Sequence, residues 1–74
     1  MRVPYYSQKG GRMVTIQEAE KVRNALGMTK YEFSVKLGYS PTAYQYAEKY
    51  QKLSRWMAKE IATRYGRLLA EIRG

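Results

Sequence analysis

Polar side chains that can pair with nucleic-acid bases lie in a short predicted helix, residues 41–49. Gln45 is the strongest candidate for reading a base, because a glutamine amide can make two hydrogen bonds to adenine. Thr42 can contact a thymine methyl group, and Tyr46 can contact a base or a phosphate. The alternative for this face is an ordinary solvated helix surface. The sequence therefore predicts base contacts from Pro41, Thr42, Gln45 and Tyr46.

Basic residues near this helix supply the charge that phosphate binding needs. The chain has 14 Lys and Arg residues against 6 acidic residues, a net charge of +8. Such an excess favours a polyanionic partner, nucleic acid before an anionic membrane surface. Lys30 begins a predicted helix, where its charge adds to free backbone N–H groups. The candidates for phosphate contacts are Lys30, Lys36, Ser40, Lys49, Lys52 and Arg55.

Residue types that support metal or nucleophile chemistry are missing. The chain contains no Cys and no His, which excludes zinc-finger sites and Cys- or His-based nucleophile–base pairs. The glutamates fall mostly at helix caps and on helix surfaces rather than in a paired acid–base site. Apolar runs are too short to span a membrane. We therefore expect no enzyme activity, no cofactor, no metal and no membrane partner.

Four helix starts can be recognised from side-chain oxygens that accept a backbone hydrogen bond. Thr15 and Thr29 are each followed three residues later by a glutamate, which is the capping-box pattern. Ser40 precedes Pro41, a residue favoured at the first helical position. Ser54 precedes a fourth helical segment. These signals place helix starts near residues 16, 30, 41 and 55.

Two glycines mark helix ends, because glycine readily adopts the positive φ that often follows a helix. They are Gly27 and Gly38. Together with the starts, they predict an all-α fold of four to five helices. The predicted helices are 16–26, 30–37, 41–49 and 55–65, with 67–73 as a fifth helix or a continuation through Gly66.

Apolar side chains recur at helical spacing within these segments. On the 41–49 helix, Ala43, Tyr44 and Ala47 share the face opposite to Thr42 and Gln45. Ser34 supplies a small side chain where two helices must approach closely. The predicted core consists of Ile16, Ala19, Val22, Leu26, Phe33, Leu37, Tyr39, Tyr44, Ala47, Met57 and Ile61.

The first 14 residues differ in composition from the rest of the chain. They contain Arg2, Lys9, Arg12 and the Gly10-Gly11 pair, with no acidic residue. This composition predicts a flexible basic arm over 1–14, followed by one folded domain over 15–74. The arm is either an ordinary terminus or a segment that follows a DNA minor groove. Met13 is an alternative start of the protein.

Several short motifs resemble the Xre/Cro/cI-like family of phage and bacterial transcriptional regulators. Gly27-Met28-Thr29 is similar to the family's Gly-Leu-Thr before its second helix, and Phe33-Ser34 stands at its Leu-Ala. Leu37-Gly38-Tyr39-Ser40 resembles its Leu-Gly-Val-Ser turn. Glu48 stands at its acidic residue, and residues 61–66 resemble its closing Ile-Ala-x-x-Leu-Gly. The resemblance covers about residues 15–66.

The resemblance implies a compact lambda-repressor-like DNA-binding domain with a helix-turn-helix at about 29–49. It further implies a cytoplasmic repressor, in a bacterial or phage-infected cell, that binds a palindromic operator in double-stranded DNA. A buried ion pair between Arg23 and Glu48 is implied as well. The chain departs from the family at Tyr44, Ala47 and Tyr50, where Ile or Val, a bulkier residue and Gly are usual.

Surplus apolar residues in the C-terminal segment, about 55–73, predict a homodimer interface. Two-fold dimers read paired half-sites about one DNA turn apart. The same side chains can instead close the core of a monomer. An alternative function is a helix-turn-helix protein-interaction module, such as an inhibitor or an antitoxin-like adaptor. The dimer candidates are Trp56, Leu68, Leu69 and Ile72.

Overall fold

Five α-helices make up the part of the chain that the computed structural model describes, residues 13–74. No strand occurs within this range, so the predicted all-α class with four to five helices is confirmed. Except for Met13 and Val14, the predicted basic arm lies outside the described residues. The helices are α1 (Ile16–Leu26), α2 (Lys30–Lys36), α3 (Ala43–Lys49), α4 (Arg55–Arg64) and α5 (Gly66–Arg73).

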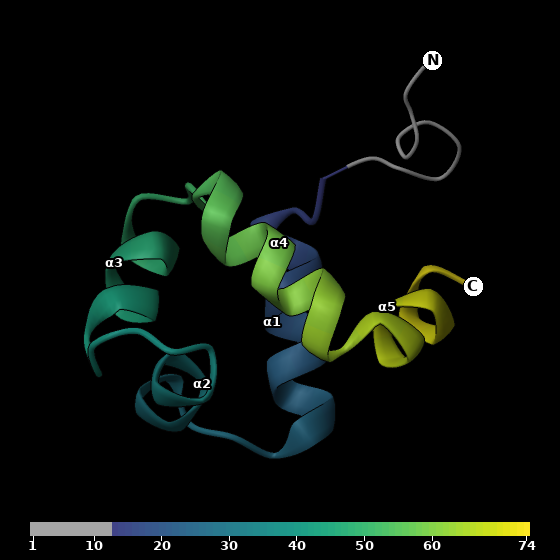
Figure 1. The fold of residues 1–74 in the computed structure, drawn as a ribbon, viewed down its shortest axis with the longest axis horizontal. Helices are drawn as coiled ribbons and strands as arrows, with labels where there is room; N and C mark the ends of the chain where they lie inside the picture. The colour runs from purple at the N-terminus through teal and green to yellow at the C-terminus, as the bar shows by residue number, and fades with distance from the viewer. Residues whose placement is uncertain (1–12) are drawn as a thin grey trace.

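The helices α2 and α3 lie together at one end of the fold, and α5 lies at the other (Figure 1). The helix α4 crosses α1 in the middle of the molecule (Figure 1). Direct packing joins α2 with α3, α1 with α5, and α4 with α5. The α2–α3 pair therefore presents its outer surface away from the C-terminal helix.

Side-chain caps begin three of the helices as the sequence predicts. Thr15 Oγ1 accepts the N–H of Glu18 at 3.1 Å, and Glu18 Oε1 accepts the N–H of Thr15 at 3.0 Å. Thr29 and Glu32 make the same reciprocal pair at 3.1 and 2.9 Å. Ser54 Oγ accepts the N–H of Met57 at 3.1 Å. Each cap satisfies backbone donors that have no partner inside the helix.

The predicted helix ends at Gly27 and Gly38 are also confirmed. Both glycines have positive φ, 69° and 86°. The N–H of Met28 donates to the carbonyl of Arg23 at 3.2 Å, and the N–H of Tyr39 donates to that of Ser34 at 3.0 Å. This is the hydrogen-bond pattern that ends a helix with a left-handed residue.

The third helix begins later than predicted, at Ala43 rather than Pro41. Thr42 makes no side-chain cap, and the carbonyl of Ser40 accepts the N–H of Ala43 at 3.1 Å in a turn. Pro41 therefore belongs to the turn between α2 and α3.

The backbone breaks between α4 and α5 at Tyr65, which adopts φ −124° and ψ 32°. This break makes α5 a separate helix instead of a continuation of α4.

The core matches most of the prediction and adds three residues to it. Leu26, Tyr39 and Ala47 are partly buried, and the other predicted core residues are buried. Val14, Ala58 and Leu69 are also buried, although the predicted core did not include them. Val14 precedes the Thr15 cap, and it shares the core with Ala19 in the arrangement of a hydrophobic staple. Val14 therefore belongs to the folded domain and not to the predicted arm. The buried residues are Val14, Ile16, Ala19, Val22, Phe33, Leu37, Tyr44, Met57, Ala58, Ile61 and Leu69.

The C-terminal helix packs onto the fold and does not stand out from it. Leu69 is buried, and Leu68 and Ile72 pack against the same core. Arg73 donates from Nε and Nη2 to the two carboxylate oxygens of Glu18, both at 2.9 Å, which ties α5 to the first turn of α1. The prediction that these three apolar residues form a dimer interface is therefore wrong for Leu69. The alternative, that they close the monomer core, describes their packing.

Candidate nucleic-acid interface

The helix α3 divides into a buried and an exposed face along the predicted line. Tyr44 is fully buried, whereas Gln45 and Tyr46 are exposed, Tyr46 to 59%. Thr42 and Lys49 are also exposed. The predicted base-reading side chains, apart from partly buried Pro41, are thus open to a partner.

Ser34 locks the turn between α2 and α3. Its side chain is fully buried, and its Oγ donates to the carbonyl of Ser40 at 2.5 Å. The same oxygen accepts the N–H of Tyr44 at 3.1 Å. A small side chain was predicted here for close packing alone. The hydroxyl also satisfies a donor in the first turn of α3 that lacks a helical partner.

Tyr44 anchors the buried face of α3 to two other helices. Its ring meets the ring of Phe33 edge to face, with centroids 4.9 Å apart and an interplanar angle of 84°. Its hydroxyl donates to Glu20 Oε2 of α1 at 2.6 Å. Burial, reinforced by this hydrogen bond to Glu20, raises the pKa of Tyr44 above its ordinary value of 10.0. Tyr44 departs from the pattern of the family that the sequence resembles, and here it fixes the orientation of α3.

Glu20 and Arg23 form the centre of a polar network on α1. Arg23 Nη2 lies 2.7 Å from Glu20 Oε1, and Arg23 Nη1 donates to the carbonyl of Met28 at 2.8 Å. The hydrogen bond from Arg23 lowers the pKa of Glu20, although partial burial opposes the shift. The hydrogen bond to Glu20 likewise raises the pKa of Arg23. This network joins α1, the turn after it and α3.

The predicted direct ion pair between Arg23 and Glu48 does not form. Glu20 lies three residues before Arg23 on the same helix and takes its guanidinium group. Glu48 instead binds the ammonium group of Lys30. Glu48 still lies close enough to contribute to the raised pKa of Arg23. The Arg23 guanidinium group pairs with a carboxylate on its own helix, and the family resemblance did not include that carboxylate.

The Lys30 ion pair changes the predicted phosphate site at the beginning of α2. The ammonium group is bound to a carboxylate, and both side chains are partly exposed. The Thr29–Glu32 capping box also uses backbone groups at this helix end and adds a second carboxylate there. Lys30 is therefore not the free cation that the sequence suggested.

Three of the exposed cations that make no ion pair lie at the end of α3 and the beginning of α4. Among the described residues, Lys49, Lys52 and Arg55 are exposed and make no salt bridge. Lys49 Nζ lies 5.5 Å from the ring centroid of Tyr50, and Arg55 Cζ lies 6.0 Å from that of Trp56. We call these five residues the basic aromatic surface. It continues along the chain directly from the exposed face of α3.

Tyr50 and Trp56 give this surface its aromatic character. Tyr50 is 65% exposed and Trp56 is 67% exposed. Tyr50 was not predicted as a site residue, although it follows the exposed Tyr46 by four residues and so falls on the same side. Exposed rings next to cations are suited to contacts with nucleic acid, whose backbone is anionic and whose bases offer stacking faces where they are unpaired.

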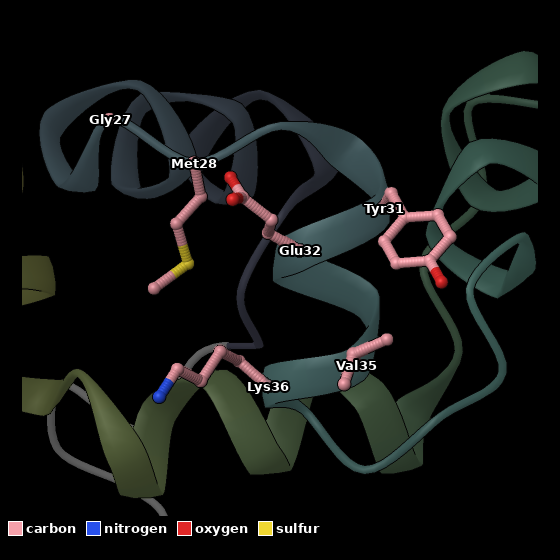
Figure 2. A pocket seen from close by; sticks show the side chains of 6 residues that line it. All are labelled: Gly27, Met28, Tyr31, Glu32, Val35 and Lys36. Carbon is pink, nitrogen blue, oxygen red and sulfur yellow. The ribbon is translucent and has the colours of Figure 1, made fainter.

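Two other predicted phosphate contacts are placed differently. Ser40 is exposed in the turn before α3, and its carbonyl accepts the Ser34 hydroxyl. Lys36 lies at the end of α2, where its side chain points away from α3 (Figure 2). The structure therefore does not bring Lys36 to the α3 face.

Lys36 lies at an open groove around the outer face of α2. The groove has a volume of about 550 Å³. Exposed Tyr31 and Val35 contribute apolar surface, and Met28 and Lys36 extend into the space beside the helix (Figure 2). Its lining residues are Gly27, Met28, Tyr31, Glu32, Val35 and Lys36.

Metal binding and membrane-spanning helices can also be examined among the described residues. Within residues 13–74, no group of three or more acidic residues is arranged to hold a metal ion. None of the helices in this range has the length and apolar character needed to cross a membrane.

Comparison of the chain with protein-family models, curated proteins and solved structures finds no match. The features of this chain that bear on its function are therefore the geometry of α3 and the charges around it.

Proposed function

We propose that the chain is a sequence-specific double-stranded DNA-binding transcriptional regulator, most simply a repressor, with α3 as its recognition helix. The α2–α3 pair would act as a helix-turn-helix of the lambda-repressor-like, Xre/Cro/cI kind, in the cytoplasm of a bacterial or phage-infected cell. The observation that carries this proposal is the exposed polar face of α3 next to cations that make no salt bridge within residues 13–74.

The exposed face of α3 offers suitable chemistry for reading base edges. An α-helix fits the DNA major groove, where each base pair presents a distinct pattern of donors and acceptors. Gln45 can pair with adenine through its amide, and Thr42 can contact a thymine methyl group. Buried Tyr44 and Ser34 hold the helix from behind, so the reading face has a fixed orientation.

The basic aromatic surface would hold the DNA backbone beside this helix. Lys49, Lys52 and Arg55 can each neutralise a phosphate, which positions a protein on DNA without reading the sequence. Among the described residues they make no salt bridge, which supports this role, because no such ion pair has to break on binding.

A homodimer remains part of the proposal, but with a smaller set of candidate contacts. Leu69 is buried within the subunit, and Leu68 and Ile72 pack on the same core. Trp56 is the remaining exposed candidate from the predicted dimer residues. A two-fold dimer would bind a palindromic operator with half-sites about one DNA turn apart.

Selection from a pool of randomised DNA duplexes at two salt concentrations tests the proposed function. A regulator enriches a defined sequence that persists at the higher salt concentration, and a dimer enriches a two-fold symmetric one. Trp56 is the single tryptophan of the chain, so its fluorescence offers an independent signal for binding. If no sequence is enriched and the higher salt concentration abolishes all binding, sequence-specific recognition is contradicted.

A second candidate function is a protein-interaction module, and the groove on α2 favours it. Exposed Tyr31 and Val35 at this groove form an apolar surface on α2. An adaptor of this kind would enrich no duplex sequence in the selection. It would also keep its protein partner when Gln45→Ala and Lys30→Ala are combined, whereas a regulator would bind its operator more weakly with the Gln45 change.

A further inference from the structure

The Lys30–Glu48 ion pair joins the beginning of α2 to the last turn of α3. The side chains are 40% and 30% exposed, so the pair is open to solvent and to a ligand. Glu48 immediately precedes Lys49, the first cation of the basic aromatic surface. The pair therefore involves the same helix that carries Gln45 and Lys49.

Glu48 is the single carboxylate on α3. A phosphate that approaches Lys30 meets a cation that is already bound to this carboxylate. If the phosphate displaced Glu48, it would leave a second negative charge next to its own, and like charges at short range repel. The carboxylate of Glu48 thus cancels the contribution that Lys30 would otherwise make to backbone binding.

We propose that Glu48 limits the affinity of this protein for DNA of any sequence by holding the ammonium group of Lys30. This inference rests on the proposed function. Phosphate contacts supply non-specific binding and carry no sequence information. With one such contact withheld, the base contacts from α3 make up a larger share of the binding free energy.

The test compares Glu48→Gln with Glu60→Gln in binding to a duplex of arbitrary sequence across a salt titration. Glu60 pairs with Arg64 on α4, with side chains of similar exposure, 36% and 47%. Both variants raise the net charge by one, so the general effect of charge is matched. Glu48→Gln is expected to steepen the slope of log affinity against log salt by about 0.9, and to raise affinity about fivefold to tenfold at 0.1 M salt. Glu60→Gln is expected to change the slope little.

Adding Lys30→Gln to Glu48→Gln identifies the cation that is released. The double variant is expected to return to the wild-type slope. Equal salt slopes for Glu48→Gln and Glu60→Gln would overturn the inference. A gain in DNA affinity by Glu48→Gln that persists when Lys30 is also replaced would overturn it as well.

Lys30→Gln alone tests the same inference if Glu48→Gln fails to fold. Lys30 neutralises no phosphate in the wild type, so its removal should leave the salt slope unchanged. A slope reduced by about one unit would overturn the inference. Failure of the wild type to bind any duplex would overturn the proposed function together with this inference. Normal wild-type binding, with Glu48→Gln no steeper in salt slope than Glu60→Gln or with a reduced slope for Lys30→Gln, would overturn this inference alone.

Discussion

The hydroxyl of Tyr44 donates a 2.6 Å hydrogen bond to the carboxylate of Glu20, and this contact ties α3 to α1. Glu20 in turn holds Arg23, whose guanidinium group also binds the carbonyl of Met28. The exposed face of α3 is therefore oriented by a polar contact on its buried face. The stability and the function of the domain should both depend on this contact.

Removing the hydroxyl alone measures what the contact contributes to stability. Tyr44→Phe keeps the ring that packs on Phe33 and leaves Glu20 bound to Arg23. Hydrogen bonds to charged groups contribute about 1.5–3 kcal/mol, so we expect a loss near the lower figure in denaturant unfolding. Tyr46→Phe is the matched control on the same helix, because its hydroxyl is exposed and makes no hydrogen bond among the described residues. Equal unfolding free energies for the two variants would show that the contact is not stabilising.

The raised pKa of Tyr44 predicts a loss of stability at alkaline pH. Burial and Glu20 favour the protonated phenol in the folded state, so folding is fully supported below the ordinary pKa of 10.0. Above that pH the unfolded chain loses the proton first, and the folded state loses its advantage. The difference in unfolding free energy between wild type and Tyr44→Phe should therefore shrink as pH rises above 10. A difference that stays constant from neutral pH to well above 10 would contradict the assignment.

The buried hydroxyl of Ser34 predicts a further loss of stability. Ser34→Ala leaves the N–H of Tyr44 and the carbonyl of Ser40 without their present partner. A buried polar group left unpaired costs about 1–3 kcal/mol, and we expect a loss in this range by thermal or denaturant unfolding. Thr63→Ala on the exposed side of α4 serves as the control and should stay within about 0.5 kcal/mol of wild type. If Ser34→Ala matched that control, the hydroxyl would have no part in holding the turn.

Replacing one residue in the turn after α3 by glycine should stabilise the protein. Gln51 adopts a φ of 51°, the left-handed region that side chains with a Cβ rarely occupy. Gln51→Gly should raise the unfolding free energy by about 0.5–1 kcal/mol, because relief of strain exceeds the entropy cost of glycine. Gln51→Ala keeps the strain and loses the 2.8 Å side-chain bond to the carbonyl of Glu48, so it should destabilise. A destabilised Gln51→Gly would mean that this bond outweighs the backbone strain.

Local signals predicted the helices well because caps and end signals act within a few residues. The Thr15 and Thr29 caps and the positive φ of Gly27 and Gly38 could all be predicted from neighbouring residue types. The start of α3 was misplaced by two residues, because Ser34 in the preceding helix takes part in the turn around Ser40. Such a contact depends on tertiary packing, which local propensity does not include.

The sequence was enough to predict which side chains of α3 are exposed, but not which charged residues pair with one another. Helical periodicity placed Gln45 and Tyr46 on the exposed side, because the period of a helix fixes which side chains share a face. It could not show which carboxylate each cation would meet. Arg23 binds Glu20, and Lys30 binds Glu48, because distances between helices decide these pairs.

The affinity of Gln45→Ala for the selected duplex, and for the same duplex with single base-pair changes, tests the central claim most directly. If α3 reads bases, the variant should lose about 1–3 kcal/mol of discrimination at one base pair and keep the wild-type salt slope. Lys52→Gln should instead weaken binding to all duplexes and reduce the slope by about one unit. If Gln45→Ala discriminates between the duplexes as well as the wild type does, α3 is not the recognition helix.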